Sequence, residues 1–176
     1  MAATTLFLDT EFTGLDDPYP LLISIGLAAQ NGQSSYYAEL DRQHWAMKAD
    51  NWVYQNVVPL LSETQPLSID MLGRQLRTWI GAFDDEVRIV CDSVEYDWRL
   101  VKPLLDIAWP ACLMSEPYQF GPRTVGEALE PKVRGAMEVW HTAERPLHHA
   151  LHDAGALRAG WLAAREAGWR PPWSDG

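Results

Sequence analysis

The sequence predicts an α/β fold in which a mixed β-sheet is flanked by α-helices. The chain opens with three strand-like segments, apolar residues then recur at helical spacing, and a further apolar strand segment lies between two helical ones. Strands followed by alternating helices and strands are typical of α/β proteins with a mixed sheet. The 176 residues contain no internal repeat, low-complexity tract or interdomain linker, so residues 1–176 are expected to form a single domain.

The N-terminal segments predict a β-meander. Thr4–Asp9 is a short apolar strand, and Leu21–Ala29 is a second one whose nearly continuous apolarity suits burial on both faces. Asn31 and Gly32 then favour the positive φ angles of a tight hairpin, which leads into a third strand at Ser34–Glu39.

Helical spacing follows the meander. We expect helices over Ala49–Leu61 and Ile69–Phe83, the second capped by Ser68, and then a fourth strand at Val87–Cys91. The remaining elements are expected to be a helix kinked by a proline, a short fifth strand, a short helix and a long last helix. They span, in this order, Tyr96–Ile107 (with Pro103), Ala111–Met114, Val125–Leu129 and His149–Ala167, the last ended by Gly168 and Pro171–Pro172.

The composition limits the class of protein. The formal net charge of −10 argues against a nucleic-acid binder held by a broad basic face, although this argument weakens if carboxylates bind metal ions. Two cysteines, Cys91 and Cys112, are expected to be free buried thiols in a reducing compartment. The longest apolar run is half a membrane span and the first residues do not resemble a secretion signal, so we expect a cytoplasmic protein without membrane contact.

Nine tryptophans are unusual for this length. Four of them fall in segments with helical spacing, where packing in a core or an interface is a better explanation than stacking on nucleic-acid bases. They are Trp52, Trp79, Trp98 and Trp161.

Four acidic residues stand out by their positions relative to the predicted elements. Asp9 and Glu11 end the first strand, and residues two apart on a strand project to the same side. Asp97 follows the fourth strand, and Asp153 lies in the last helix. Each alone is explained by a polar strand end or by a helix N-terminus that favours acids. Together they form an all-oxygen ligand set that suits Mg²⁺ or Mn²⁺.

Two divalent cations would neutralise the four carboxylates and change the formal charge from −10 to −10 + 4 = −6. Two ions about 3.5–4 Å apart clamp the attacking and leaving oxygens of a phosphoryl displacement. His148 is suited to accept the proton of the attacking water near neutral pH.

The stretch HHALHDA leaves the role of each histidine open. His148 is five residues before Asp153, about 140° round a helix, so the two side chains meet only if His148 lies on the loop entering the helix. The pair of His148 and His152 has helical spacing and suggests a metal clip instead. A zinc hydrolase using these two histidines is therefore an alternative, although it leaves the four acids unexplained.

Three motifs in order along the chain resemble a known family. LFLDTEFTG, VCDSVEYD and HHALHDA, with LISIGLAAQNGQSSYYAE after the first, are similar to the DEDDh branch of 3′-to-5′ exonucleases, which have a ribonuclease H-like fold. The resemblance covers essentially the whole chain. It is closest to the small bacterial ribonuclease AS-like exoribonucleases, relatives of ribonuclease T and oligoribonuclease.

The resemblance implies roles for individual residues. It assigns Asp9, Glu11, Asp97 and Asp153 as metal ligands, His148 as the general base, and Thr10 and Phe12 as contacts to the terminal nucleotide. The chain departs from the family pattern at Asp92-Ser93, where many members have His-Asn. This change is expected to affect how the nucleotide or the second metal ion is held.

The resemblance also implies the function. We expect a two-metal 3′-to-5′ exoribonuclease that uses Mg²⁺ or Mn²⁺, releases nucleoside 5′-monophosphates from RNA 3′ ends and forms a homodimer. A single-stranded DNA exonuclease and a non-catalytic acidic binding module on the same scaffold are the alternatives. Arg99, Lys102 and Arg123 are candidate contacts to the nucleic-acid backbone, although solvated surface charge also explains them.

Overall fold

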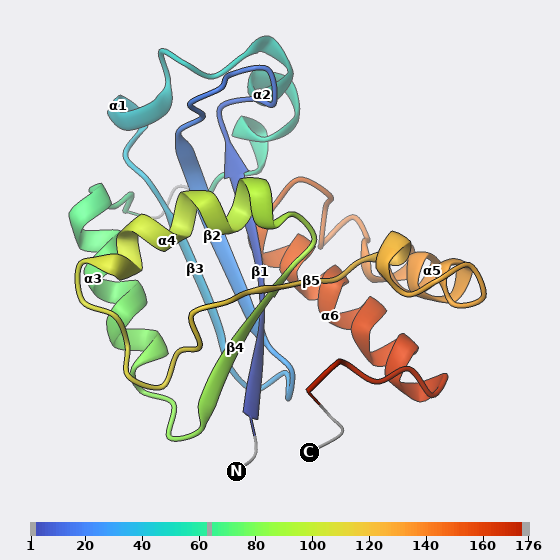
Figure 1. Ribbon diagram of the computed structural model, residues 1–176. Coiled ribbons are helices and arrows are strands. Elements are labelled where there is room, and N and C mark those ends of the chain that lie inside the picture. Colours follow the sequence, from blue (N-terminus) through green and yellow to red (C-terminus); the bar gives the residue numbers. More distant parts are fainter. Residues whose placement is uncertain (1–2, 63–64, 174–176) are drawn as a thin grey trace.

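A five-stranded mixed sheet lies at the centre of the protein (Figure 1), as the computed structural model of residues 3–62 and 65–173 shows. The strand order is β3-β2-β1-β4-β5. β1 pairs antiparallel with β2 and parallel with β4, so the predicted mixed sheet is confirmed. In chain order the strands are β1 (Ala3–Phe12), β2 (Leu22–Ala29), β3 (Ser35–Glu39), β4 (Glu86–Cys91) and β5 (Tyr118–Gln119).

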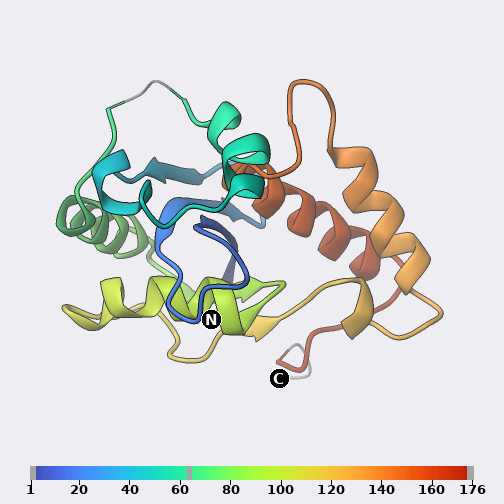
Figure 2. The same cartoon turned by 90° about the horizontal axis from the view of Figure 1, so that it is seen from above.

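Helices cover both faces of this sheet. Figure 2 shows α4 and α6 on opposite sides of it, with α3 beside α4 and α5 packed against α6. The α-helices are α1 (Arg42–Trp45), α2 (Asn51–Asn56), α3 (Ile69–Ile80), α4 (Arg99–Asp106), α5 (Glu130–Trp140) and α6 (Ala150–Glu166). Two short 3₁₀ helices, η1 (Val58–Leu60) and η3 (Pro122–Thr124), and a π-helical turn, η2 (Val94–Trp98), complete the structure. No helix in the described ranges is long and apolar enough to cross a membrane.

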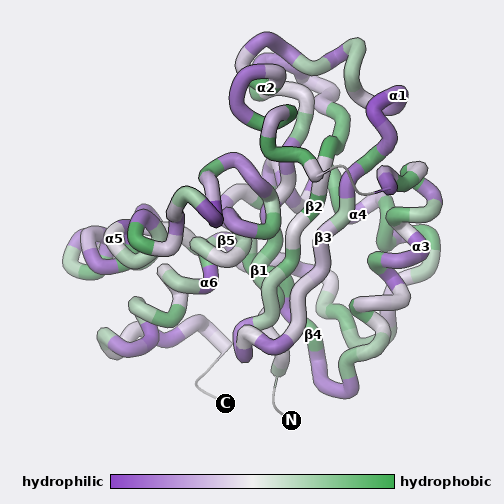
Figure 3. Tube along the Cα trace, turned by 180° about the vertical axis from the view of Figure 1, so that it is seen from behind, coloured by the Kyte–Doolittle hydropathy of each residue, from purple (hydrophilic) through white to green (hydrophobic). Residues whose placement is uncertain are grey.

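The alternation of side chains along β1 supplies both cores. Leu6 and Leu8 join the hydrophobic cluster beneath α3 and α4, whereas Phe7 joins the cluster beneath α6 with Trp161. β2 is buried along most of its length, as its apolar run predicted. In Figure 3, β1 at the centre of the sheet has the green colour of hydrophobic residues, and α1 at the periphery has the purple colour of hydrophilic ones.

Several local predictions are confirmed. The hairpin between β2 and β3 is present with Gly32 at φ +72°, although Asn31 does not take the positive φ expected for it. The side chain of Ser68 caps α3 by accepting from the backbone of Met71. Both cysteines are free, Cys91 buried and Cys112 partly buried. The helix expected over Ala49–Leu61 is present in part, as α2 followed by η1.

Two predictions between residues 111 and 140 are wrong. Ala111–Met114 is a turn with one isolated bridge to β4, and the fifth strand is Tyr118–Gln119. Val125–Leu129 is also a turn, because Gly126 takes a positive φ of +84°. The helix in this region is α5, which fully buries only Val133 and otherwise consists of exposed and partly buried residues, so its apolar spacing is weak.

The start of α6 lies directly on the backbone of β2. A Cβ atom added to Gly26 would be 2.3 Å from the carbonyl carbon of Ala150, the first residue of α6. Glycine at this position therefore sets the distance between the sheet and the helix that carries Asp153. Gly155 on α6 similarly allows contact with Trp140 of α5, because a Cβ there would lie 2.6 Å from its ring.

Gly26→Ala is expected to lower the free energy of unfolding by about 1–3 kcal/mol or more, because the added methyl group must push α6 away from β2. Gly135→Ala is the matched control, since nothing lies within 4 Å of an added Cβ. In the helix interior that change should stabilise the protein by about 0.5–1 kcal/mol. Urea unfolding of both variants checks the prediction, and equal stability would contradict the close packing described for Gly26.

Candidate active site

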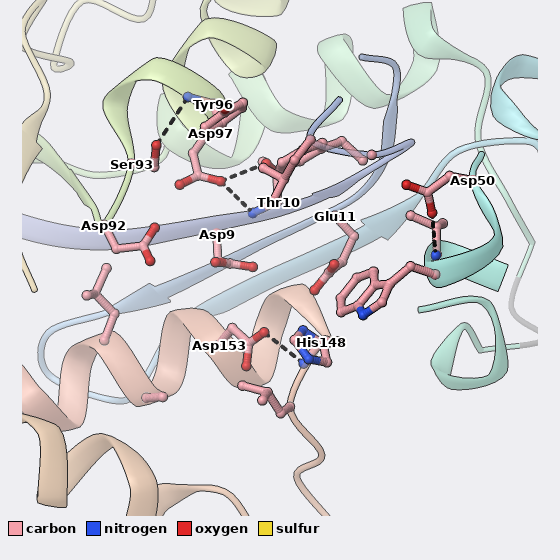
Figure 4. Close-up of a pocket in the computed structure, with 18 of the residues that line it drawn as sticks. Asp9, Thr10, Glu11, Asp50, Asp92, Ser93, Tyr96, Asp97, His148 and Asp153 are labelled. Atoms are coloured by element: carbon pink, nitrogen blue, oxygen red, sulfur yellow. Dashed lines mark hydrogen bonds between the residues drawn. The ribbon is translucent and has the colours of Figure 1, made fainter. Parts of the chain in front are cut away.

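A cavity of about 640 Å³ opens between β1, η2 and the start of α6 (Figure 4). Its volume is in the range of small-molecule sites. The structure brings all seven residues that the sequence analysis selected into its lining: Asp9, Thr10, Glu11, Phe12, Asp97, His148 and Asp153.

β1 supplies two of the carboxylates. The strand is longer than predicted and includes Glu11 and Phe12, with a shift in register between these two residues where it pairs with β2. Asp9 and Glu11 are two residues apart on this strand and both reach the cavity (Figure 4).

η2 positions Asp97. The hydroxyl of Ser93 caps this turn by accepting from the backbone N–H of Tyr96. Thr10 donates to Oδ1 of Asp97 twice, from its backbone N at 3.1 Å and from its hydroxyl at 2.7 Å. Both donors of Thr10 are thus engaged, so a direct hydrogen bond of Thr10 with a nucleotide would use an acceptor, such as its hydroxyl oxygen. π-Helical turns are rare and are frequent at functional sites.

His148 lies on the loop before α6 and not on the helix. Its backbone has φ +67°, and its N–H donates to Oδ2 of Asp153 at 2.9 Å. His149 is the N-cap residue of α6. This left-handed conformation places the ring of His148 in the cavity next to Glu11 and Asp153, the one arrangement in which the two motif residues can meet.

His141 is a site residue that the sequence analysis missed. Its Nε2 lies 3.4 Å from Oδ1 of Asp153, and its Nδ1 lies 3.3 Å from the carbonyl oxygen of Arg145. It stands seven residues before His148 on an irregular loop. No motif or helical spacing in the sequence connects it with Asp153.

The potential ligand atoms form two groups, each with members within 4.8 Å of one another. One group contains Glu11, His148 and Asp153, and the other contains Asp9, Asp92 and Asp97. Asp92 is thus a fifth carboxylate next to the four predicted ones. The sequence analysis noted Asp92 as a departure from the family pattern and did not place it among the metal ligands.

Burial and mutual repulsion raise the pKa values of the four predicted acids. Burial raises the pKa of Glu11 to about 8 and that of Asp153 to about 7, with neighbouring carboxylates adding to both shifts. The pKa values of Asp9 and Asp97 are also raised well above their ordinary values, first by burial and then by nearby acids. Full ionisation of this pocket at neutral pH therefore requires cations.

The zinc alternative is not supported by the arrangement of the histidines. The ring of His152 stacks on that of His149 at 4.2 Å, and His149 stacks on Tyr37 at 4.4 Å. Neither potential metal group in the described part of the chain contains His152. Because His148 lies outside the helix, His148 and His152 are not one helical turn apart on the same helix face, as a metal clip would require.

Aromatic side chains line the mouth of the cavity. Phe12 stacks on Tyr96 with ring centroids 5.4 Å apart, and Trp52 contacts the ring of His148 edge-on at 4.8 Å. Trp52 is 50% exposed, so it is not the core residue that its helical setting suggested. Trp98 and Trp161 are buried as predicted.

The cavity is poor in cationic side chains. No lysine or arginine is among its described lining residues, and the candidate backbone contacts Arg99, Lys102 and Arg123 all lie outside it. Arg99 donates to the carbonyl of Pro18, and Lys102 pairs with Asp106. A phosphate group that enters this cavity therefore meets carboxylates and histidines.

Comparison with solved structures identifies the fold. The nuclease domain of 3′hExo, a DEDDh family member bound to rAMP, matches with a TM-score of 0.63 over 94% of this chain and 92% of that chain, at 8% identity. The protein has a ribonuclease H-like fold. Exonuclease I, of which this chain spans 41%, matches with a TM-score of 0.64 over 94% of this chain, at 10% identity. The sequence matches no family model and no curated protein.

Titration of the buried acids is expected to lower the stability of the metal-free protein between pH 5 and pH 8, most clearly above pH 6.5. Below that pH, the lowered pKa values of His148, His149 and His152 act in the opposite direction. A carboxyl group with a raised folded-state pKa keeps a proton that the unfolded chain releases, so the free energy of unfolding falls as the pH rises toward the folded pKa. For Glu11 this window runs from 4.5 to about 8. Each pKa unit is worth about 1.4 kcal/mol, or about 3–6 °C in Tm for a chain of this size.

Calorimetry in a chelating buffer measures this effect, and adding Mn²⁺ should raise Tm more at pH 8 than at pH 5. Glu11→Gln removes one of the titrating groups and should flatten the pH dependence. A metal-free Tm that rises between pH 6.5 and pH 8, above the range in which the histidines titrate, would contradict the raised pKa values of the acids.

Proposed function

We propose that the protein is a metal-dependent 3′-to-5′ exoribonuclease that releases nucleoside 5′-monophosphates. The observation that carries this proposal is the convergence of carboxylates and His148 in a cavity whose described lining contains no lysine or arginine, on a fold shared with exonuclease domains. An acidic cavity attracts a phosphodiester only when cations are bound in it. The RNA specificity and the ribonuclease AS-like kinship rest on the motif resemblance.

The side chains fit Mg²⁺ or Mn²⁺. Oxygen ligands suit hard cations, and Oδ2 of Asp97 is buried without a hydrogen-bond partner among the described residues. Asp9 would contact both ions, Glu11 and Asp153 would hold the ion next to the attacking water, and Asp97 would hold the other. When bound, two such ions supply stabilisation for the attacking and leaving oxygens of an in-line displacement.

His148 would accept the proton of the attacking water at a ring nitrogen. Burial lowers the pKa of His148, and electrostatic interaction with His141 lowers it further, so the imidazole is neutral and able to accept a proton at pH 7. The hydrogen bond from the His148 backbone to Asp153 fixes its distance from the ligand group. The edge contact with Trp52 restricts the orientation of the ring.

The terminal nucleotide would lie between the carboxylates and the aromatic mouth. Phe12, supported by Tyr96, offers an apolar surface to a base or sugar. Thr10 serves this site by holding Asp97 in place. The homodimer and the cytoplasmic location stay predictions from the resemblance and the composition.

Substitution of Asp97 and of His148 tests the assignment. Asp97→Ala is expected to abolish metal-dependent turnover, and His148→Ala to reduce it by about 10²–10⁴-fold. Shortening of an RNA oligomer labelled at its 5′ end measures turnover for both variants, and chromatography identifies the nucleoside monophosphates that are released. The control is Asp106→Asn, an acid at the surface that pairs with Lys102. Wild-type turnover by Asp97→Ala would refute the proposed function.

The substrate class is tested with matched oligomers. A single-stranded RNA and a DNA of the same sequence differ in the 2′-OH group, which lets proteins distinguish the two. We expect faster shortening of the RNA from its 3′ end in the presence of Mg²⁺. Faster shortening of the DNA would instead support the single-stranded DNA exonuclease, and binding without shortening of either would support a non-catalytic module.

A further inference from the structure

Asp92 lies beside the four acids that the proposed function uses. We propose that Asp92 is a fifth metal-binding carboxylate, which forms with Asp9 and Asp97 an all-carboxylate site for one divalent cation. The inference rests on the proposed function and extends it, because it makes one ion site largely independent of bound nucleotide. It is carried by the position of Asp92, by an unpartnered oxygen of Asp97 and by the charges around them.

The backbone of Asp92 is fixed by β5. Asp92 directly follows the end of β4, and its carbonyl oxygen accepts a hydrogen bond of 2.9 Å from the side chain of Gln119. Phe120 donates from its backbone to the carbonyl of Cys91 at 2.9 Å, which holds the preceding residue as well. With its backbone held, the side chain of Asp92 reaches the cavity on the same side as Asp9 and Asp97 (Figure 4).

Asp97 provides an independent indication of a cation site. This residue is 3% exposed, and its Oδ1 receives both hydrogen bonds from Thr10. Its Oδ2 is buried and has no hydrogen-bond partner in the described part of the chain. A buried carboxylate oxygen without a donor is costly unless it is protonated or bound to a cation.

Asp9, Asp92 and Asp97 are placed so that one cation could bind all three. One carboxylate oxygen of each residue lies within 4.8 Å of those of the other two. No described lysine or arginine lines the cavity to neutralise them. Three carboxylates and no imidazole favour a hard cation such as Mg²⁺ or Mn²⁺.

The two sites would then differ in chemistry. The group of Glu11, His148 and Asp153 contains an imidazole that the proposed reaction needs as a base, whereas the group with Asp92 contains only carboxylates. Catalytic Mg²⁺ is usually held by one or two carboxylates together with substrate phosphates. A third carboxylate replaces part of what the phosphate supplies, so this ion is retained when the product leaves.

Titration with MnCl₂ in the absence of nucleotide tests the inference. We expect the wild-type protein to bind Mn²⁺, and Asp92→Asn to bind one ion at least about tenfold more weakly. The matched control is Glu95→Gln, an exposed acid three residues away that does not line the cavity. Its titration should superimpose on that of the wild type.

Two results overturn different claims. If Asp92→Asn binds Mn²⁺ with the same affinity and stoichiometry as the wild type, the role of Asp92 is wrong and the proposed function stands. If the wild-type protein binds no Mn²⁺, the proposed function fails as well.

Thermal unfolding in a chelating buffer separates ligation from a structural role. Removing the charge of Asp92 reduces repulsion with Asp9 and Asp97, so the metal-free Asp92→Asn protein should be at least as stable as the wild type. A lower Tm for this variant without metal would show that Asp92 supports the fold itself, and would overturn the inference.

Discussion

Repulsion among buried carboxylates is the constraint on which the site depends. Folding gathers acids from β1, the end of β4, η2 and α6 into one cavity, and burial together with mutual repulsion raises the pKa values of Asp9, Glu11, Asp97 and Asp153. Hydrophobic packing on both faces of the sheet supplies the free energy that holds them there. Bound cations would offset this repulsion at neutral pH and would attract a phosphate group.

The backbone departs from regular geometry at the points where the site needs it. A π-helical turn carries Asp97, a left-handed residue carries the ring of His148, and β1 shifts its register next to Glu11. Non-glycine residues in the left-handed region cost free energy and cluster at functional sites. For His148 part of this cost is offset by the hydrogen bond from its N–H to Asp153. Gly26, where α6 contacts β2, sets the distance across which these groups face one another.

Local patterns in the sequence predicted the first four strands and the four acids, because alternation along a strand and the position after a strand are local properties. The position of His148 on the loop before α6 followed from exclusion, since a residue five positions back on a helix cannot meet Asp153, whereas its left-handed conformation was not predicted. The failures have physical causes. α5 buries one side chain and has weak apolar spacing, His141 reaches Asp153 through an irregular loop, and Trp52 is exposed because a short helix places it at the cavity mouth. Asp92 is held in the site by the pairing of β4 with β5, and the sequence analysis predicted this fifth strand at the wrong residues.

The central claim is that paired divalent cations occupy the acidic cavity and bring a nucleotide's phosphate to His148. Anomalous diffraction at the manganese edge from crystals grown with Mn²⁺ and adenosine 5′-monophosphate tests it most directly. The account predicts two manganese peaks, one near Glu11 and Asp153 and one near Asp9 and Asp97, with the phosphate between them and the sugar next to Phe12. Manganese peaks only outside the cavity, or a nucleotide bound away from these carboxylates, would contradict it.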